Sequence, residues 1–286
     1  MTRSLAALAL GAVLITPIAA IAQDSSPLWR TVDIARQLHD SLPQRIRVQY
    51  GAGRVELRGS DDPLLYAMHL RYDERRGAPV HRYDAAARRA VLGLETRDGA
   101  QRLGDHDKGG ELRLVLPGSV PLDLDLQLGG TESRLDLGGL ALRSLRLECG
   151  ATDANIVFSQ PNRVQMGDLT MDVGAADLLA VNLANANADQ IRVHGGVGVV
   201  DLEFGGRWTR DLALDARLAI GNLILRVPPD VGIRIDVDRV IAGFDHEGMV
   251  KRDGAWYSTN YDAAPHKLTV HAQTYFGQIE LQRESR

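Results

Sequence analysis

The chain has 286 residues, of which 44% are hydrophobic and 5% aromatic, and its formal net charge is −4. A chain with a negative balance lacks the basic surface that binding to nucleic acid or to an anionic membrane requires, so we expect neither partner. Its single cysteine, Cys149, excludes an intramolecular disulfide and a zinc site built from several cysteines.

Residues 1–22 have the three parts of an export signal. Arg3 gives a positive start, an apolar stretch runs from Leu5 to Ile21, and Ala20-Ile21-Ala22 supplies the small-x-small cleavage pattern. We expect cleavage near Ala22, which removes one basic residue, and a soluble periplasmic or secreted product. No later stretch has the length of apolar residues needed to span a bilayer, so we expect no stable membrane insertion.

Residues 23–118 are expected to form an N-terminal β region that caps the repeats after it. Ile46-x-Val48-x-Tyr50-Gly51 followed by Val55-x-Leu57 has the strand, glycine, strand form of those repeats. Residues 61–110 show less pattern. Within them, residues 95–110 are rich in Gly, Asp and Arg, which favours a mobile loop.

Residues 119–241 repeat. An apolar-x-apolar alternation recurs every 21 to 24 residues, with strand starts at Leu124, Leu145, Leu169, Ile191, Leu212 and Ile233. A second alternating pair follows a few residues later, so each unit predicts a strand, a glycine corner, a strand and a polar turn. The fifth unit departs from this form, because Ala216-Arg217 stands where the others have a glycine.

These repeats predict an all-β fold. One unit cannot bury its apolar face alone, but units stacked in parallel at about 4.8 Å per rung share a continuous aliphatic core. We therefore predict a β-helix-like parallel β-solenoid, one strand repeat per rung, with diverged β caps at both ends.

Residues 242–286 are expected to form the C-terminal capping segment. Leu268-x-Val270-x-Ala272 and Gly277-x-Ile279-x-Leu281 restore the repeat form, whereas residues 242–266 show little pattern. Because the end of a solenoid exposes unpaired backbone, we interpret the patterned runs on both flanks as caps or diverged rungs.

Several segments resemble the bacterial toast-rack proteins. They are Tyr50-Gly51-Ala52-Gly53-Arg54-Val55, Leu116-Pro117, Val120-Pro121-Leu122 and the unit that begins Gly150-Ala151-Thr152. The resemblance implies a β-solenoid-like envelope protein, distantly similar to adhesin-like domains and to the extracytoplasmic part of cell-wall-active antibiotic response proteins. That family is of unassigned function and offers no catalytic residue to carry over.

Polar side chains at the second outward position of each repeat should form one exposed ladder. Aligned by the strand starts, its charged and histidine members are Glu148, Asp172, His194, Asp215 and Asp236. Rung spacing puts Glu148 and Asp172 about 5 Å apart, as in a retaining glycosidase. His194, between Asp172 and Asp215, could take part in acid–base catalysis. Any acidic ladder on a solenoid has this spacing, however, and neighbouring arginines compensate the charge, so we expect a solvated, charge-paired face.

No enzyme motif stands out. The serines lie in no nucleophile-elbow sequence, and the glycine-rich run at 195–198 precedes no helix, which favours a β corner over a phosphate loop. We predict no catalytic residue, cofactor or metal, and a non-enzymatic module for binding, scaffolding or stress sensing in the cell envelope. Its partner would be an envelope protein or a polysaccharide. The alternative is a carbohydrate-active enzyme, a polysaccharide lyase or hydrolase that uses the carboxylate ladder.

Overall fold

The computed structural model describes residues 27–96 and 109–283. The expected export signal and most of the expected loop at 95–110 lie outside these residues. Within them, fifteen strands form one sheet, and a short 3-10 helix at Leu183–Ala186 lies between β9 and β10. The strands before the repeats are β1 (Trp29–Gln37), β2 (Gln44–Ser60), β3 (Leu64–Asp73), β4 (Gly77–Asp84), β5 (Arg89–Thr96) and β6 (Gly110–Pro117). The repeats and the strands after them are β7 (Pro121–Asp136), β8 (Ala141–Val157), β9 (Met166–Val181), β10 (Ala188–Glu203), β11 (Leu212–Val227), β12 (Gly232–Phe244), β13 (Met249–Arg252), β14 (Ala255–Ser258) and β15 (Lys267–Arg283).

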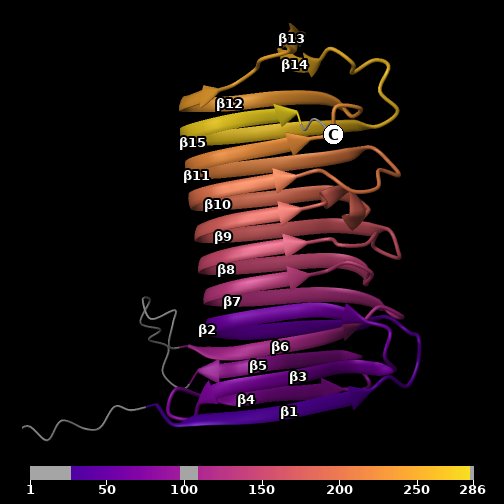
Figure 1. Ribbon diagram of the computed structural model, residues 1–286, viewed down its shortest axis with the longest axis vertical. Helices are drawn as coiled ribbons and strands as arrows, with labels where there is room; N and C mark the ends of the chain where they lie inside the picture. Colours follow the sequence, from indigo (N-terminus) through magenta and orange to yellow (C-terminus); the bar gives the residue numbers. More distant parts are fainter. Residues whose placement is uncertain (1–26, 97–108, 284–286) are drawn as a thin grey trace, which may run out of the picture.

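The long strands stack as the rungs of a parallel β-solenoid, as the repeats predict. In the sheet, β2, β7, β8, β9, β10, β11, β15 and β12 follow one another, each parallel to its neighbours. Figure 1 shows each long strand turning at one edge of the molecule, on the left in this view, and running back. One strand thus supplies a first arm, a corner and a second arm.

Alternation along each arm builds the core. In β8 the first arm buries Leu145, Leu147 and Cys149, and the second arm buries Ala154 and Ile156. The inward positions change from odd to even numbers at the corner. Because neighbouring rungs are in register, these side chains form continuous apolar ladders in a single cluster. Full burial of one large aliphatic side chain stabilises the fold by roughly 1.5–3 kcal/mol.

The repeat alignment puts Cys149 at an inward position, level with Leu128 and Val173, and the structure places it there. It is in register with Leu128 on one side and Val173 on the other, and its side chain is 6% exposed. It therefore acts as a small apolar residue of the core.

The last strand does not lie at the end of the stack. β15 is inserted between β11 and β12, and Leu268, Val270 and Ala272 are completely buried there. Of the two interpretations of this run, a cap or a diverged rung, the position of β15 between two rungs agrees with the second. The strand that follows β12 in the sheet is β14, which pairs with it at Arg234 and Ile235.

The stack ends differently at the N-terminal side. Below β2, one rung is divided between β5, which pairs with the first arm, and β6, which pairs with the second. β4 then adds to β5, and β3 and β1 add to β6, all antiparallel. On the edge strand β1, the Arg36 guanidinium lies 3.9 Å from the centre of the Tyr83 ring. A charged side chain turned toward the core discourages an edge strand from pairing with another chain.

Corners in the middle of the stack contain buried threonines. Thr131 on β7 and Thr152 on β8 are 1% and 4% exposed. The Thr131 hydroxyl lies 2.8 Å from Ser133 Oγ and 3.1 Å from Thr152 Oγ1, and Thr152 also donates to the Thr131 carbonyl at 2.5 Å. The buried hydroxyls thus satisfy one another across two rungs.

Corners nearer the C-terminal end contain glycines. Gly198, Gly221 and Gly277 lie in register on β10, β11 and β15, with φ of 138°, 144° and 135°. A Cβ on Gly221 would lie 1.8 Å from the Gly198 carbonyl oxygen. Only glycine fits this close approach and this backbone conformation.

Candidate functional site

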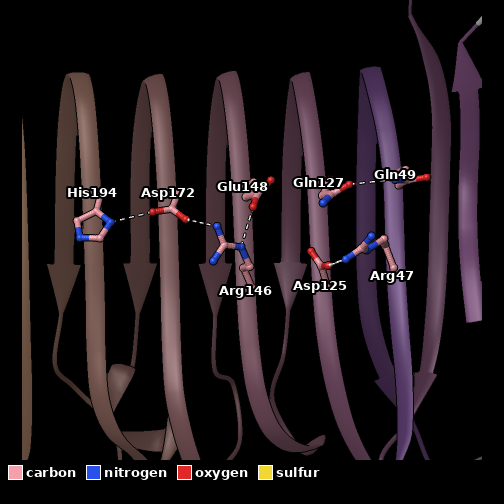
Figure 2. Close-up of polar contacts among 8 residues, drawn as sticks. All are labelled: Arg47, Gln49, Asp125, Gln127, Arg146, Glu148, Asp172 and His194. Atoms are coloured by element: carbon pink, nitrogen blue, oxygen red, sulfur yellow. Dashed lines mark hydrogen bonds and ion pairs between the residues drawn. The ribbon is translucent and has the colours of Figure 1, made fainter. Parts of the chain in front are cut away.

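Two polar columns run up the outer face of the first arms. Gln49, Gln127, Glu148, Asp172 and His194 occupy equivalent positions on five successive rungs. Figure 2 shows them beside Arg47, Asp125 and Arg146 of the neighbouring column. The sequence-predicted ladder is therefore present from Glu148 to His194.

An arginine stands between the two carboxylates that the sequence singles out. Arg146 Nε lies 2.7 Å from Glu148 Oε1, and Arg146 Nη2 lies 2.9 Å from Asp172 Oδ2. Its hydrogen bond to Glu148 raises the pKa of the Arg146 guanidinium. His194 Nδ1 lies 2.9 Å from the other oxygen of Asp172 (Figure 2). Glu148 and Asp172 are thus held by one cation, which differs from the free acid and nucleophile of a retaining glycosidase.

Asp215 and Asp236 do not continue this ladder. Leu214, and not Leu212, is in register with Ile191, so the residue beside His194 is Arg217. Asp215 lies in the neighbouring column beside Arg192, and Asp236 is in that column beyond His271.

Both carboxylates have their own arginine. Arg217 Nη2 lies 2.8 Å from Asp215, and Arg234 Nη2 lies 2.8 Å from Asp236. His194 consequently has a carboxylate on one side only, and the expected histidine between two aspartates is not formed. Exposed pairs of this kind contribute roughly 0–1 kcal/mol each.

A groove of about 800 Å³ lies on the outer face of the second arms, at the N-terminal end. It crosses β1, β3, β6, β2, β7 and β8, whose outward residues here include small apolar ones, Ala35, Ala67, Val115 and Val157. Sequence reasoning missed this groove. Two of its strands, β1 and β3, lie outside the repeat and are added to the sheet by antiparallel pairing, which no repeat encodes.

The groove contains cations with different partners. Arg113 Nη2 lies 2.7 Å from Glu111, and Arg134 Nη2 lies 2.5 Å from Glu132. Arg58 donates to the Gly59 carbonyl at 3.5 Å and forms no ion pair with any acidic residue in 27–96 or 109–283. An exposed guanidinium in a groove, free of a carboxylate, is suited to bind an anionic group of a ligand.

Among the described residues, no three metal-ligating side chains come together. In the same part of the chain, no helix has the length and apolar character needed to cross a membrane.

The fold and these surfaces define a repeat β-solenoid with a charge-paired exterior. The family model for the N-terminal domain of toast_rack, DUF2154, matches residues 30–178, which is more than half of the chain. The chain therefore belongs to the toast-rack family. The match ends within β9, so the glycine corners of β10, β11 and β15 lie beyond it.

Three bacterial proteins of known structure are examples of a similar fold. The chain is 13% identical to a candidate cell-adhesion protein from Clostridium sporogenes, covering 91% of this chain and 100% of that chain at a TM-score of 0.45. It is 9% identical to a candidate adhesin from Bacteroides fragilis, covering 90% of this chain and 98% of that chain at a TM-score of 0.46. It is 10% identical to a candidate lipid-binding protein from Parabacteroides distasonis, covering 90% of this chain and 95% of that chain at a TM-score of 0.32. No curated protein matches the chain. At such identities and TM-scores, these likenesses carry no argument about a ligand.

Proposed function

We propose that this chain is an exported, non-catalytic binding module of the cell envelope. The observation that carries the proposal is Arg146, whose guanidinium lies within 3 Å of both Glu148 and Asp172. A retaining glycosidase needs one carboxyl group that is free to protonate the substrate and a second that is free to attack it, whereas here both carboxylates are bound by the same guanidinium. The ladder thus supports a charge-paired surface.

The groove on the second arms is the surface that we propose for the ligand. Its length across six strands suits an extended polymer, and Arg58 supplies a cation with no acidic partner among the described side chains. An acidic envelope polysaccharide fits both features, because a guanidinium binds a carboxylate or phosphate through two parallel hydrogen bonds.

Export is the second part of the proposal and rests on the pattern at residues 1–22. Amino-terminal sequencing of the protein recovered from the periplasm of expressing cells tests it. We expect Gln23 as the first residue. A retained Met1, or recovery that requires detergent, would count against export as a soluble protein.

A panel of cell-wall and capsular polysaccharides tests the binding module against the enzyme. We expect an acidic polysaccharide to bind without release of new reducing ends or unsaturated products. Arg58→Ala should weaken that binding about tenfold or more, since a hydrogen bond to a charged group contributes roughly 1.5–3 kcal/mol.

The matched control is the double variant Asp172→Ala, His194→Ala, which should bind like the parent. Turnover by the parent that this double variant loses would support the carbohydrate-active enzyme instead.

A further inference from the structure

Exposed apolar side chains gather at the glycine corners. Of the seven exposed large hydrophobic residues in the described chain, four lie there: Val197, Ile220, Tyr275 and Phe276, each 48–53% exposed. Val197 on β10 is in register with Ile220 on β11, and Ile220 with Phe276 on β15. These four residues form a corner ridge along the edge where the strands turn (Figure 1).

Corner geometry explains why the ridge is exposed. Val197, Ile220 and Phe276 each precede a glycine with positive φ, and the inward alternation resumes after that glycine. Their side chains therefore stand outside the core. At the equivalent position, β9 has Ala175. The outward side chain thus grows along the stack from alanine through valine and isoleucine to phenylalanine.

The ridge can be covered without burying an unpaired charge. On the first-arm side, the nearest column continues from His194 to Arg217 and Gln273, and Arg217 is held by Asp215 at 2.8 Å. On the second-arm side, Asn222 and Gln278 are uncharged. The carboxylate in the same column, Asp177 on β9, lies one rung beyond the ridge and accepts a hydrogen bond from the Val199 N–H at 3.2 Å. Covering the four ridge residues therefore removes apolar area from water and leaves this hydrogen bond to the carboxylate in place.

We infer that the corner ridge is a contact between two copies of this chain, packed with their stacks antiparallel. A second copy presents side chains at the same spacing of about 4.8 Å per rung, which few other partners do. In the antiparallel arrangement Phe276 faces Ala175 and Ile220 faces Val197, so a large side chain meets a small one at each rung. A two-fold axis between β10 and β11 makes the contact self-complementary.

The contact is a weak one. Four half-exposed side chains on a convex edge cover much less than the roughly 800 Å² per partner of a stable interface. The dimer should therefore depend on concentration. A lipid surface is the other apolar partner to consider. The negative net charge of the chain and the absence of a lysine or unpaired arginine among the described residues flanking the ridge disfavour an anionic bilayer.

Sedimentation velocity of the mature chain from micromolar to millimolar concentration tests the inference. We expect the parent to dimerise, and Ile220→Asp to weaken the dimer at least about a hundredfold because it places a carboxylate in the apolar contact. Val250→Asp is the control, since Val250 is 51% exposed on β13, away from the ridge. Circular dichroism should show all three proteins folded.

Disulfide capture tests the orientation. An equal mixture of Val197→Cys and Ile220→Cys should form cross-linked dimers faster than either variant alone, because only the mixture places the two thiols opposite each other in pairs. Cys149 is buried and stays in place.

Three results would overturn the inference. They are a parent that stays monomeric at every concentration, a dimer that Val250→Asp weakens as much as Ile220→Asp, and cross-linking that the mixture does not favour. Flotation with vesicles of phosphatidylethanolamine and phosphatidylglycerol completes the test. A monomeric parent that floats, beside an Ile220→Asp variant that does not, would assign the ridge to a lipid surface instead.

Discussion

The same bend of the solenoid is built by different chemistry in two regions. At the threonine corners of β7 and β8, a hydroxyl side chain points into the core and is satisfied by its neighbour one rung away. At the glycine corners of β10, β11 and β15, that position has no side chain, and the backbone of one rung packs directly on the next.

The difference determines what the outer surface of the corner can do. Threonine corners present glycine and alanine outward, as at Gly150 and Ala151, whereas glycine corners present valine, isoleucine and phenylalanine. The family match over residues 30–178 includes the threonine corners and the glycine corner of β2 at Gly53, which is in register with Thr131, and it stops before the glycine corners of β10, β11 and β15. The two regions therefore share a fold and differ in the surface that the fold exposes.

Removing a whole rung should give the largest loss of stability. Excision of Leu169 to Gln190 joins Asp168 to Ile191. The register is kept, because Asp168 on β9 pairs with Gln190 on β10 and so takes its place. The threonine corner of β8 then lies beside the glycine corner of β10. We expect a folded, cooperative and less stable protein, because inward positions keep their parity. Circular dichroism and thermal melts measure it. Excision of Val181 and Asn182 is the comparison, and it should cost more per residue removed. An unfolded whole-rung variant would show that the two regions are not built from equivalent rungs.

Gly221→Ala should cause the next largest loss. Its Cβ would lie 1.8 Å from the Gly198 carbonyl oxygen, at a φ of 144°. Backbone strain and the clash together should cost at least about 3 kcal/mol. Gly150→Ala is the matched change in the threonine region, where the nearest atom is 3.2 Å away. It should cost less than about 1 kcal/mol. Urea unfolding measures the loss of stability in both variants. Similar losses in Gly221→Ala and Gly150→Ala would show that the two kinds of corner do not differ in this way.

Cys149 reports on burial beside a threonine corner. Burial raises the pKa of its thiol to about 12. The unfolded thiol ionises near pH 8.5, so the unfolded state binds fewer protons above that pH and the free energy of unfolding falls as pH rises toward 12. Between pH 8 and pH 10, the parent should lose more stability than Cys149→Ala. A native thiol that reacts at once with a maleimide would contradict this burial.

Changes on the polar columns should have the smallest effect. Asp172→Ala and His194→Ala remove partners whose side chains are 31% and 45% exposed. Each should change the free energy of unfolding by no more than about 1 kcal/mol. Urea unfolding of both variants measures it. A loss near that of Gly221→Ala would mean that the columns stabilise the stack as strongly as the corners do.

Local alternation was enough to predict the rungs, the inward Cys149 and the ladder from Glu148 to His194. It could not set the register of β11. A slip of two residues keeps every inward side chain inward, so Leu212 and Leu214 fit the pattern equally well. Gly221 decides between them, because it must stack on Gly198.

The repeat pattern also does not encode the order of the strands in the sheet. β12 and β15 carry the same alternation, so the pattern at Leu268 does not tell an interior rung from a terminal one. The groove could not be predicted from the sequence for a related reason. Its small outward residues, Ala35, Ala67 and Val115, gain meaning only when antiparallel pairing brings β1, β3 and β6 together.

The same substitution, threonine to valine, made in both regions tests the difference between the threonine corners and the glycine corners most directly. Thr152→Val removes a buried hydroxyl that is hydrogen-bonded to Thr131, and should lower the free energy of unfolding by about 1–3 kcal/mol. Thr274→Val, on the glycine-corner rung β15, removes a buried hydroxyl that has no hydrogen-bond partner in the described chain. It should leave stability unchanged or raise it. Urea unfolding of the two variants should therefore give changes that differ in sign or by more than about 1 kcal/mol. Equal losses would contradict the account.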